Sequence, residues 1–154
     1  MTLNRLSALT LLLPVLGVFD LCSTLYVHLL GYSLEKYEAG LFASFFAKAG
    51  LFYLYVPIYF VILFTVSFGL YRVANDLKPS LPLDKLILLL VAGAICFIYA
   101  RLTGVILSNF LFNVKSVSRI SVMWVGYVTA TISIVLFVYD ELLGFLTFSS
   151  EETV

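Results

Sequence analysis

The stretch that decides the fold is LILLLVAGAICFIYARLTGVILSNFLF, residues 86–112, in which Arg101 is the sole charged side chain. A largely uncharged apolar run longer than about 18 residues predicts a transmembrane helix. The whole chain agrees, because it is 62% hydrophobic and 12% charged, with a mean hydropathy of +1.10. A soluble domain carries about 25% charged residues. We therefore predict a multi-pass integral protein of the cell membrane.

Three further apolar runs, at about 8–31, 50–74 and 120–139, bring the number of predicted spans to four. Each must be helical, because lipid cannot satisfy open backbone groups. Short connections predict an all-α, antiparallel bundle of four transmembrane helices, formed by one domain over residues 1–154. Residues 32–49 mix charged side chains with phenylalanines, which predicts a short interfacial helix between the first two spans. Each face of the membrane would carry four basic residues, so the positive-inside rule leaves the orientation open.

The composition argues against several classes of site. Nine basic and nine acidic residues give zero net charge, and no basic block offers a nucleic-acid surface. Cys22 and Cys96 fall within apolar runs and predict no disulfide. His28 is the single histidine, and no cluster of carboxylates suits a divalent metal. We expect no cofactor and no metal, and catalysis is the least favoured class of function.

Asp20 and Arg101 carry charges near the middle of the first and third spans. Placing such a charge in lipid costs about 2.5–3.5 kcal/mol on insertion scales. The two helices run in the same direction, and at 1.5 Å per residue their Cα depths differ by about 5 Å. Thr24 lies one turn after Asp20 on the same helix face. Three interpretations stay open: a structural ion pair, a site for an ion, proton or polar ligand, and an unpaired Arg101 that reaches the membrane surface.

Small side chains recur every four residues in the last two spans, a spacing that lets helices approach closely. They are Ala92, Cys96, Ala100, Gly104 and Ser108 in the third span, and Gly126 and Ala130 in the fourth. Such a column indicates packing within the chain or an interface with another subunit. In the first connection, Glu35 and Glu38 are either a solvated pair or a second site. In the second span, Tyr53, Tyr55 and Tyr59 are expected to be interfacial and packing residues rather than a quinone or cofactor site.

A short motif supports interest in the first span. Asp20-Leu21-Cys22-Ser23-Thr24 is followed by Leu30-Gly31 and then by Glu38-Ala39. This order resembles a family of small, uncharacterised prokaryotic multi-pass membrane proteins. That family has Asp-x-x-x-Thr in its first helix, a Leu-Gly ending, and Glu-Ala-Asn-Pro at the next hydrophobic segment; here Gly40-Leu41 replaces Asn-Pro. The resemblance implies a membrane site that includes Asp20, Thr24 and Glu38, and it implies no substrate.

The leading functional hypothesis is a non-catalytic accessory or scaffold subunit of a larger membrane complex. Such a subunit would contact membrane lipids and associate through its helix faces with other membrane proteins or with itself. The second hypothesis is a small oligomeric transporter or channel, with Asp20 and Arg101 in a polar intramembrane path. The third is an intramembrane enzyme.

Overall fold

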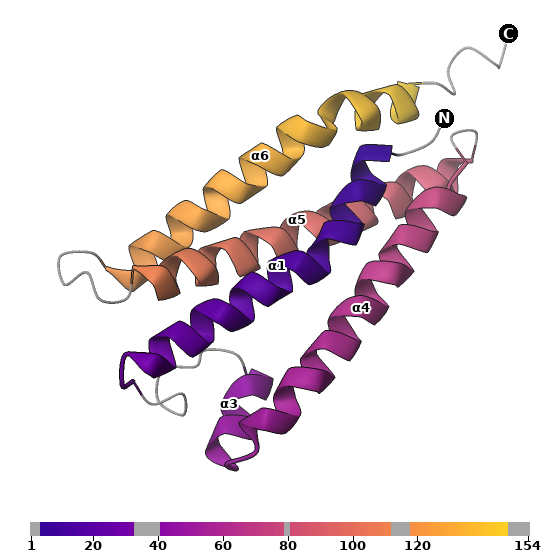
Figure 1. Cartoon of the computed structure of the whole chain (residues 1–154). Helices are drawn as coiled ribbons and strands as arrows, with labels where there is room; N and C mark the ends of the chain where they lie inside the picture. The colour runs from indigo at the N-terminus through magenta and orange to yellow at the C-terminus, as the bar shows by residue number, and fades with distance from the viewer. Residues whose placement is uncertain (1–3, 33–40, 79–80, 112–117, 148–154) are drawn as a thin grey trace, which may run out of the picture.

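The computed structural model describes residues 4–32, 41–78, 81–111 and 118–147, and these residues are helical apart from short connections. Figure 1 shows four long helices and one short one. They are α1 (Asn4–Leu29), α3 (Leu41–Lys48), α4 (Phe52–Asp76), α5 (Pro82–Phe110) and α6 (Arg119–Thr147). The predicted all-α fold is confirmed, with four long apolar helices and a short helix between the first two spans.

The ends of the helices follow familiar local chemistry. Gly31 and Gly50 come shortly after α1 and α3 with φ angles of 87° and 69°, a left-handed conformation that glycine adopts without steric cost. Pro82 opens α5, where its missing N–H has no intrahelical partner to lose. Pro14 and Pro57 lie inside α1 and α4.

One predicted boundary is in error. The first three long helices begin and end within four residues of their predicted bounds, but α6 continues to Thr147, eight residues beyond the predicted end at 139. Asp140 and Glu141, the first charged residues after the predicted span, do not end the helix. The buried Glu141 carboxylate instead accepts hydrogen bonds from the backbone where α1 begins. The acidic residues therefore extend the last helix rather than end it.

The long helices pack as an open row rather than a closed ring. α1 lies between α4 and α5, and α5 packs along α6, so that α4 and α6 are at opposite sides (Figure 1). α1 and α5 run in the same direction, as an up-down-up-down topology requires. The main hydrophobic core occupies the end of the bundle where α1 begins, and it includes Leu6, Leu9, Leu88, Ile95, Val138 and Phe145.

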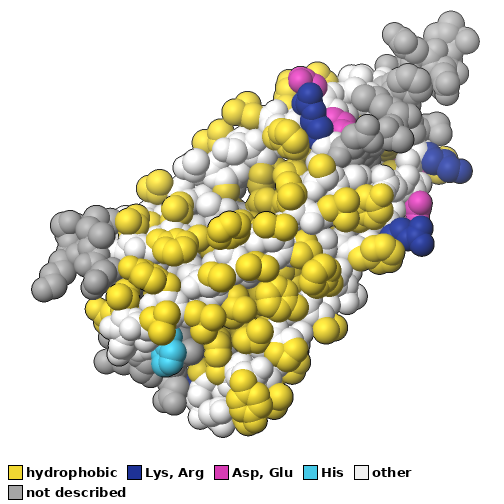
Figure 2. All heavy atoms as spheres, in the orientation of Figure 1, with side chains coloured by type: hydrophobic (Ala, Val, Ile, Leu, Met, Phe, Trp, Pro, Cys, Tyr) yellow, Lys and Arg dark blue, Asp and Glu magenta, His cyan; other side chains and the backbone are white. Residues whose placement is uncertain are grey.

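The outer surface is largely apolar. Figure 2 shows hydrophobic side chains over the visible face, with the visible Lys, Arg, Asp and Glu side chains gathered at one end. Within the described residues, four helices of 25 to 29 residues are long and apolar enough to cross a membrane, with mean hydropathies of 1.9 to 2.2. The chain is a multi-pass membrane protein.

Candidate functional site

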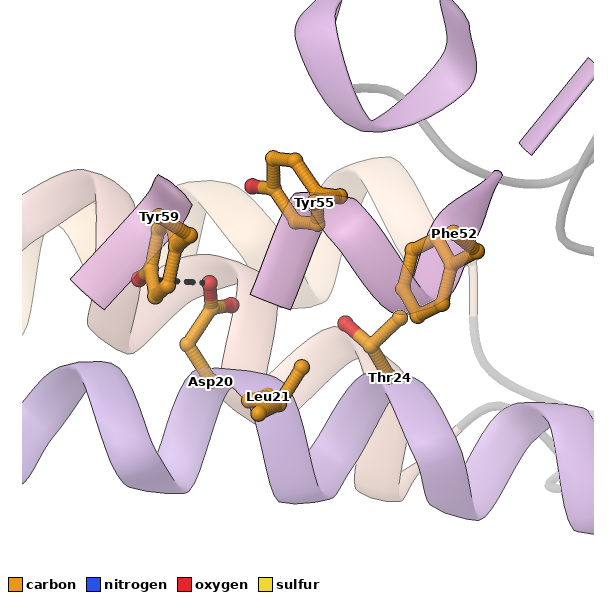
Figure 3. Close-up of a pocket in the computed structure, with 6 residues that line it drawn as sticks. All are labelled: Asp20, Leu21, Thr24, Phe52, Tyr55 and Tyr59. Carbon is orange, nitrogen blue, oxygen red and sulfur yellow. Dashed lines mark hydrogen bonds between the residues drawn. The ribbon is translucent and has the colours of Figure 1, made fainter. Parts of the chain in front are cut away.

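A small cleft opens between α1 and α4. It is lined by Asp20, Leu21 and Thr24 from α1, and by Phe52, Tyr55 and Tyr59 from α4 (Figure 3). Its volume of about 20 Å³ is enough for about one water molecule. The cleft is therefore of a size for an ion, a water molecule or a small polar group.

Asp20 points from α1 toward α4, and the Tyr59 hydroxyl donates a hydrogen bond to its Oδ2 at 3.1 Å (Figure 3). Gly17, one turn earlier on α1, makes this approach sterically feasible. A Cβ at Gly17 would collide with the Leu63 side chain and lie 3.3 Å from the Tyr59 hydroxyl oxygen. The glycine thus lets Tyr59 reach α1 at the level of Asp20. Thr24 lies on the same side of the cleft, as its spacing from Asp20 predicts.

Arg101 lies outside this cleft, on the exposed surface of α5. Of the three interpretations, the direct Asp20–Arg101 ion pair does not form among the described residues, whose salt bridge joins Arg5 and Asp140. Tyr59 is one of the partners of the Asp20 carboxylate.

Helix register explains the offset of Arg101. Asn109 Nδ2 donates to Ser23 Oγ at 3.0 Å, which sets α5 residue 109 beside α1 residue 23. Residue 106 then lies beside Asp20, and Arg101 is five residues away, about 7.5 Å of helix rise. Side chains lean toward the N-terminus of their helix. The arginine therefore leans away from the level of Asp20, not toward it.

The column of small residues faces the inside of the bundle. Ala92, Ala100, Gly104, Ser108 and Gly126 are buried, while Cys96 and Ala130 are partly buried. A Cβ on Gly126 would lie 2.7 Å from Gly104 Cα, so the two glycines mark the crossing point of α5 and α6. In this structure the column serves packing within one chain.

Two polar clusters escaped the sequence analysis. In the first, Arg119 donates from Nε to Ser108 Oγ and from Nη2 to Asn109 Oδ1, both at 3.2 Å, and Asn109 continues to Ser23. This cluster joins α1, α5 and α6 at one end of the bundle. Its sequence signal is a pair of polar residues, Ser108-Asn109, at the end of an apolar span.

The second cluster stands at the opposite end. Glu141 Oε2 accepts from the backbone N–H groups of Arg5 at 3.0 Å and Leu6 at 3.2 Å, so a carboxylate on α6 caps the start of α1. A negative charge is favourable there because the helix dipole is positive at its N-terminus. Arg5 also donates to the Phe137 carbonyl at 3.0 Å and lies 3.8 Å from Asp140.

Other predicted residues contribute no described site. Glu35 and Glu38 lie outside the described residues. His28 is exposed, with Nδ1 3.4 Å from the Tyr32 carbonyl oxygen. Within the described part of the chain, no group of three His, Cys, Asp or Glu side chains is placed to hold a metal ion.

Comparison with known proteins supplies no assignment. No family model, curated protein or solved structure matches the chain.

Proposed function

We propose that the protein is a non-catalytic accessory subunit that binds a spanning helix of another membrane protein through the exposed surface of α5. We call this surface the Arg101 face. It consists of residues three or four apart along the helix, all of them exposed: Leu86, Leu90, Gly93, Phe97 and Arg101.

The observation that carries the proposal is the position of the Arg101 guanidinium. Arg101 is nine residues, about 13.5 Å, before the end of α5 at Phe110. No hydrogen bond or salt bridge connects it to another residue among those that the structure describes. Leu90 and Phe97, on the same face, are 65% and 70% exposed. An intramembrane arginine is costly in lipid, and a partner carboxylate at the same depth would satisfy its planar set of donors.

Charge placement favours a different protein over a second copy of this chain. Four carboxylates lie at helix ends that are far in depth from Arg101: Asp76 on α4, Asp84 on α5, and Asp140 and Glu141 on α6. Asp20 is closer to Arg101 in depth than these residues are, but its side chain points into the cleft toward Tyr59. Within the described residues, a second copy therefore presents no outward-facing carboxylate where Arg101 would need one.

Photo-crosslinking in native membranes tests the proposal. A benzophenone amino acid replaces Phe97, and Ile132 on α6 is the matched control. Ile132 is 54% exposed. It lies at a depth similar to that of Phe97, because α5 and α6 run in opposite directions and Arg119 on α6 donates a hydrogen bond to Asn109 on α5. We expect a discrete adduct from position 97 with a spanning helix that carries a carboxylate, and loss of this adduct in Arg101→Gln. Adducts with lipid alone, with a second copy of the chain, or equally from both positions would contradict the proposal.

A second function, a small cation transporter or channel, is favoured by one observation. The Asp20 carboxylate and the Thr24 hydroxyl face a cleft within the membrane-spanning part of the chain. A homo-oligomer that moves cations across liposomes, with transport abolished in Asp20→Asn, would support this role. Tight liposomes under the same conditions would exclude it.

A further inference from the structure

A proline interrupts α1 inside the membrane-spanning part of the chain. Pro14 comes ten residues, about 15 Å, after the start of the helix at Asn4. Proline has no backbone N–H, so the Thr10 carbonyl, one turn earlier, loses its usual hydrogen bond within the helix. Lipid supplies no donor to replace it. Figure 1 shows that α1 bends in its first half, as a proline inside a helix predicts.

The neighbouring helices supply donors to the turn before the proline. The Ser67 hydroxyl on α4 donates to the Thr10 carbonyl, and both of these residues are buried. The Tyr99 hydroxyl on α5 donates to the Leu9 carbonyl at 2.7 Å. We call these two hydrogen bonds the clasps. They hold the same turn of α1 from two different helices.

The clasp from α4 departs from the usual behaviour of a hydroxyl inside a helix. Serine and threonine hydroxyls in helices commonly bond a carbonyl of their own preceding turn. Thr65 on α4 does this, since its hydroxyl donates to the Val61 carbonyl at 2.7 Å. Ser67, two residues later, donates instead to the α1 carbonyl that Pro14 leaves open. The proline therefore explains why this hydroxyl bonds another helix.

The two parts of α1 are held by different contacts. Before Pro14, Leu6 and Leu9 belong to the main hydrophobic core. After it, Asp20 accepts a hydrogen bond from Tyr59 across a cleft with room for about one water molecule. The bend at the proline therefore sets the separation of α1 and α4 beside Asp20.

We propose that Pro14 is a hinge in α1 and that the clasps from Ser67 and Tyr99 hold this hinge closed. Opening the hinge changes the direction of the segment 15–29, and with it the width of the cleft between α1 and α4. The inference does not depend on the accessory role, because Arg101 takes part in neither clasp.

The length of the moving segment makes the expected motion measurable. Leu29, the last residue of α1, is fifteen residues, about 22 Å, beyond Pro14. A change of about 20° in the bend, the size of a sharp kink, would move this end of the helix by about 8 Å.

A double-mutant cycle tests the clasp from Ser67. In the unmodified chain, Ser67→Ala is expected to raise the equilibrium constant of unfolding in sodium dodecyl sulfate about threefold or more. In a Pro14→Ala chain, the backbone N–H at position 14 bonds the Thr10 carbonyl, so Ser67→Ala should change the constant by less than about twofold. Thr65→Ala is the matched control, and its effect should be the same in both chains. Equal effects of Ser67→Ala in both chains would overturn the clasp, whichever way Pro14→Ala itself shifts stability.

Spin-label distances in nanodiscs test the hinge. Cys22 and Cys96 are first replaced by alanine, and one label is placed at Ile120, which is exposed on α6. The second label is placed on α1, at Leu29 beyond the hinge or, as the matched control, at Leu11 before it; both positions are exposed.

Combining Ser67→Ala with Tyr99→Phe removes both clasps. We expect the distance distribution from position 29 to shift or broaden by several ångströms and the one from position 11 to stay unchanged. A further Pro14→Ala should restore the narrow distribution from position 29. If the combined variant does not fold, Tyr99→Phe alone, which keeps the ring, decides by the same comparison. An unchanged distribution from position 29, or equal broadening from both positions, would overturn the hinge.

Discussion

Replacing Gly126 by alanine should destabilise the bundle at the crossing of α5 and α6. The new Cβ would lie 2.7 Å from Gly104 Cα and 3.1 Å from Leu107 Cδ1. Carbon atoms prefer about 3.5–4.0 Å, so the helices would have to separate by about 1 Å, since backbone atoms cannot rotate away. Overpacking of this kind costs about 1–3 kcal/mol.

The matched control is Gly69→Ala on α4, where a Cβ meets nothing within 4 Å. Alanine favours a helix over glycine by about 1 kcal/mol at both positions, so the comparison cancels this gain. We expect Gly126→Ala to be less stable than Gly69→Ala by about 1–3 kcal/mol. Unfolding by sodium dodecyl sulfate in mixed micelles measures the difference, with Trp124, the single tryptophan, as the reporter on α6. Equal midpoints for the two variants would refute the close crossing.

Three further changes test individual contacts in the same unfolding assay. Glu141→Ala removes the cap on α1 and should lower the free energy of unfolding by about 1–3 kcal/mol. Asp140→Asn, at the exposed neighbouring position, should change it by less than about 0.5 kcal/mol. Similar losses in the two variants would argue against the cap. Asn109→Leu removes the hydrogen bonds of Asn109 with Ser23 and with Arg119 and should cost about 0.6–1.7 kcal/mol, and an unchanged midpoint would remove these hydrogen bonds from the account. Tyr59→Phe keeps the ring but loses the bond to Asp20, and a loss of about 0.6 kcal/mol is expected; no shift in the infrared carboxylate band of Asp20 would contradict the contact.

The helices could be predicted from the sequence because lipid imposes one strong rule. Apolar runs long enough to cross the membrane must be helical, and this rule alone locates the long helices to within a few residues at most ends. It failed at the end of α6, where hydropathy treats Glu141 as a charge that belongs in water. The carboxylate is buried because it meets the first backbone N–H groups of α1, a partner 135 residues away in sequence.

The candidate site could be predicted only in part. The spacing of Asp20 and Thr24 places them on one face of α1 whatever the fold, and both line the cleft. Tyr55 and Tyr59 were assigned to packing, because their position against α1 depends on which helices are neighbours. Arg101 was placed at nearly the depth of Asp20 by counting along each span. The register between α1 and α5 is set by side-chain contacts such as that of Asn109 with Ser23, which counting cannot reveal.

The central claim is that Arg101 holds a partner helix by its charge, and a charge exchange tests it most directly. Once the crosslink from position 97 identifies the partner's carboxylate, co-purification is measured for Arg101→Glu, for the partner's carboxylate replaced by arginine, and for both together. The account predicts that each single change abolishes the complex and that the double change restores it. A complex that survives Arg101→Glu, or one that the double change does not restore while both proteins stay folded, would contradict it.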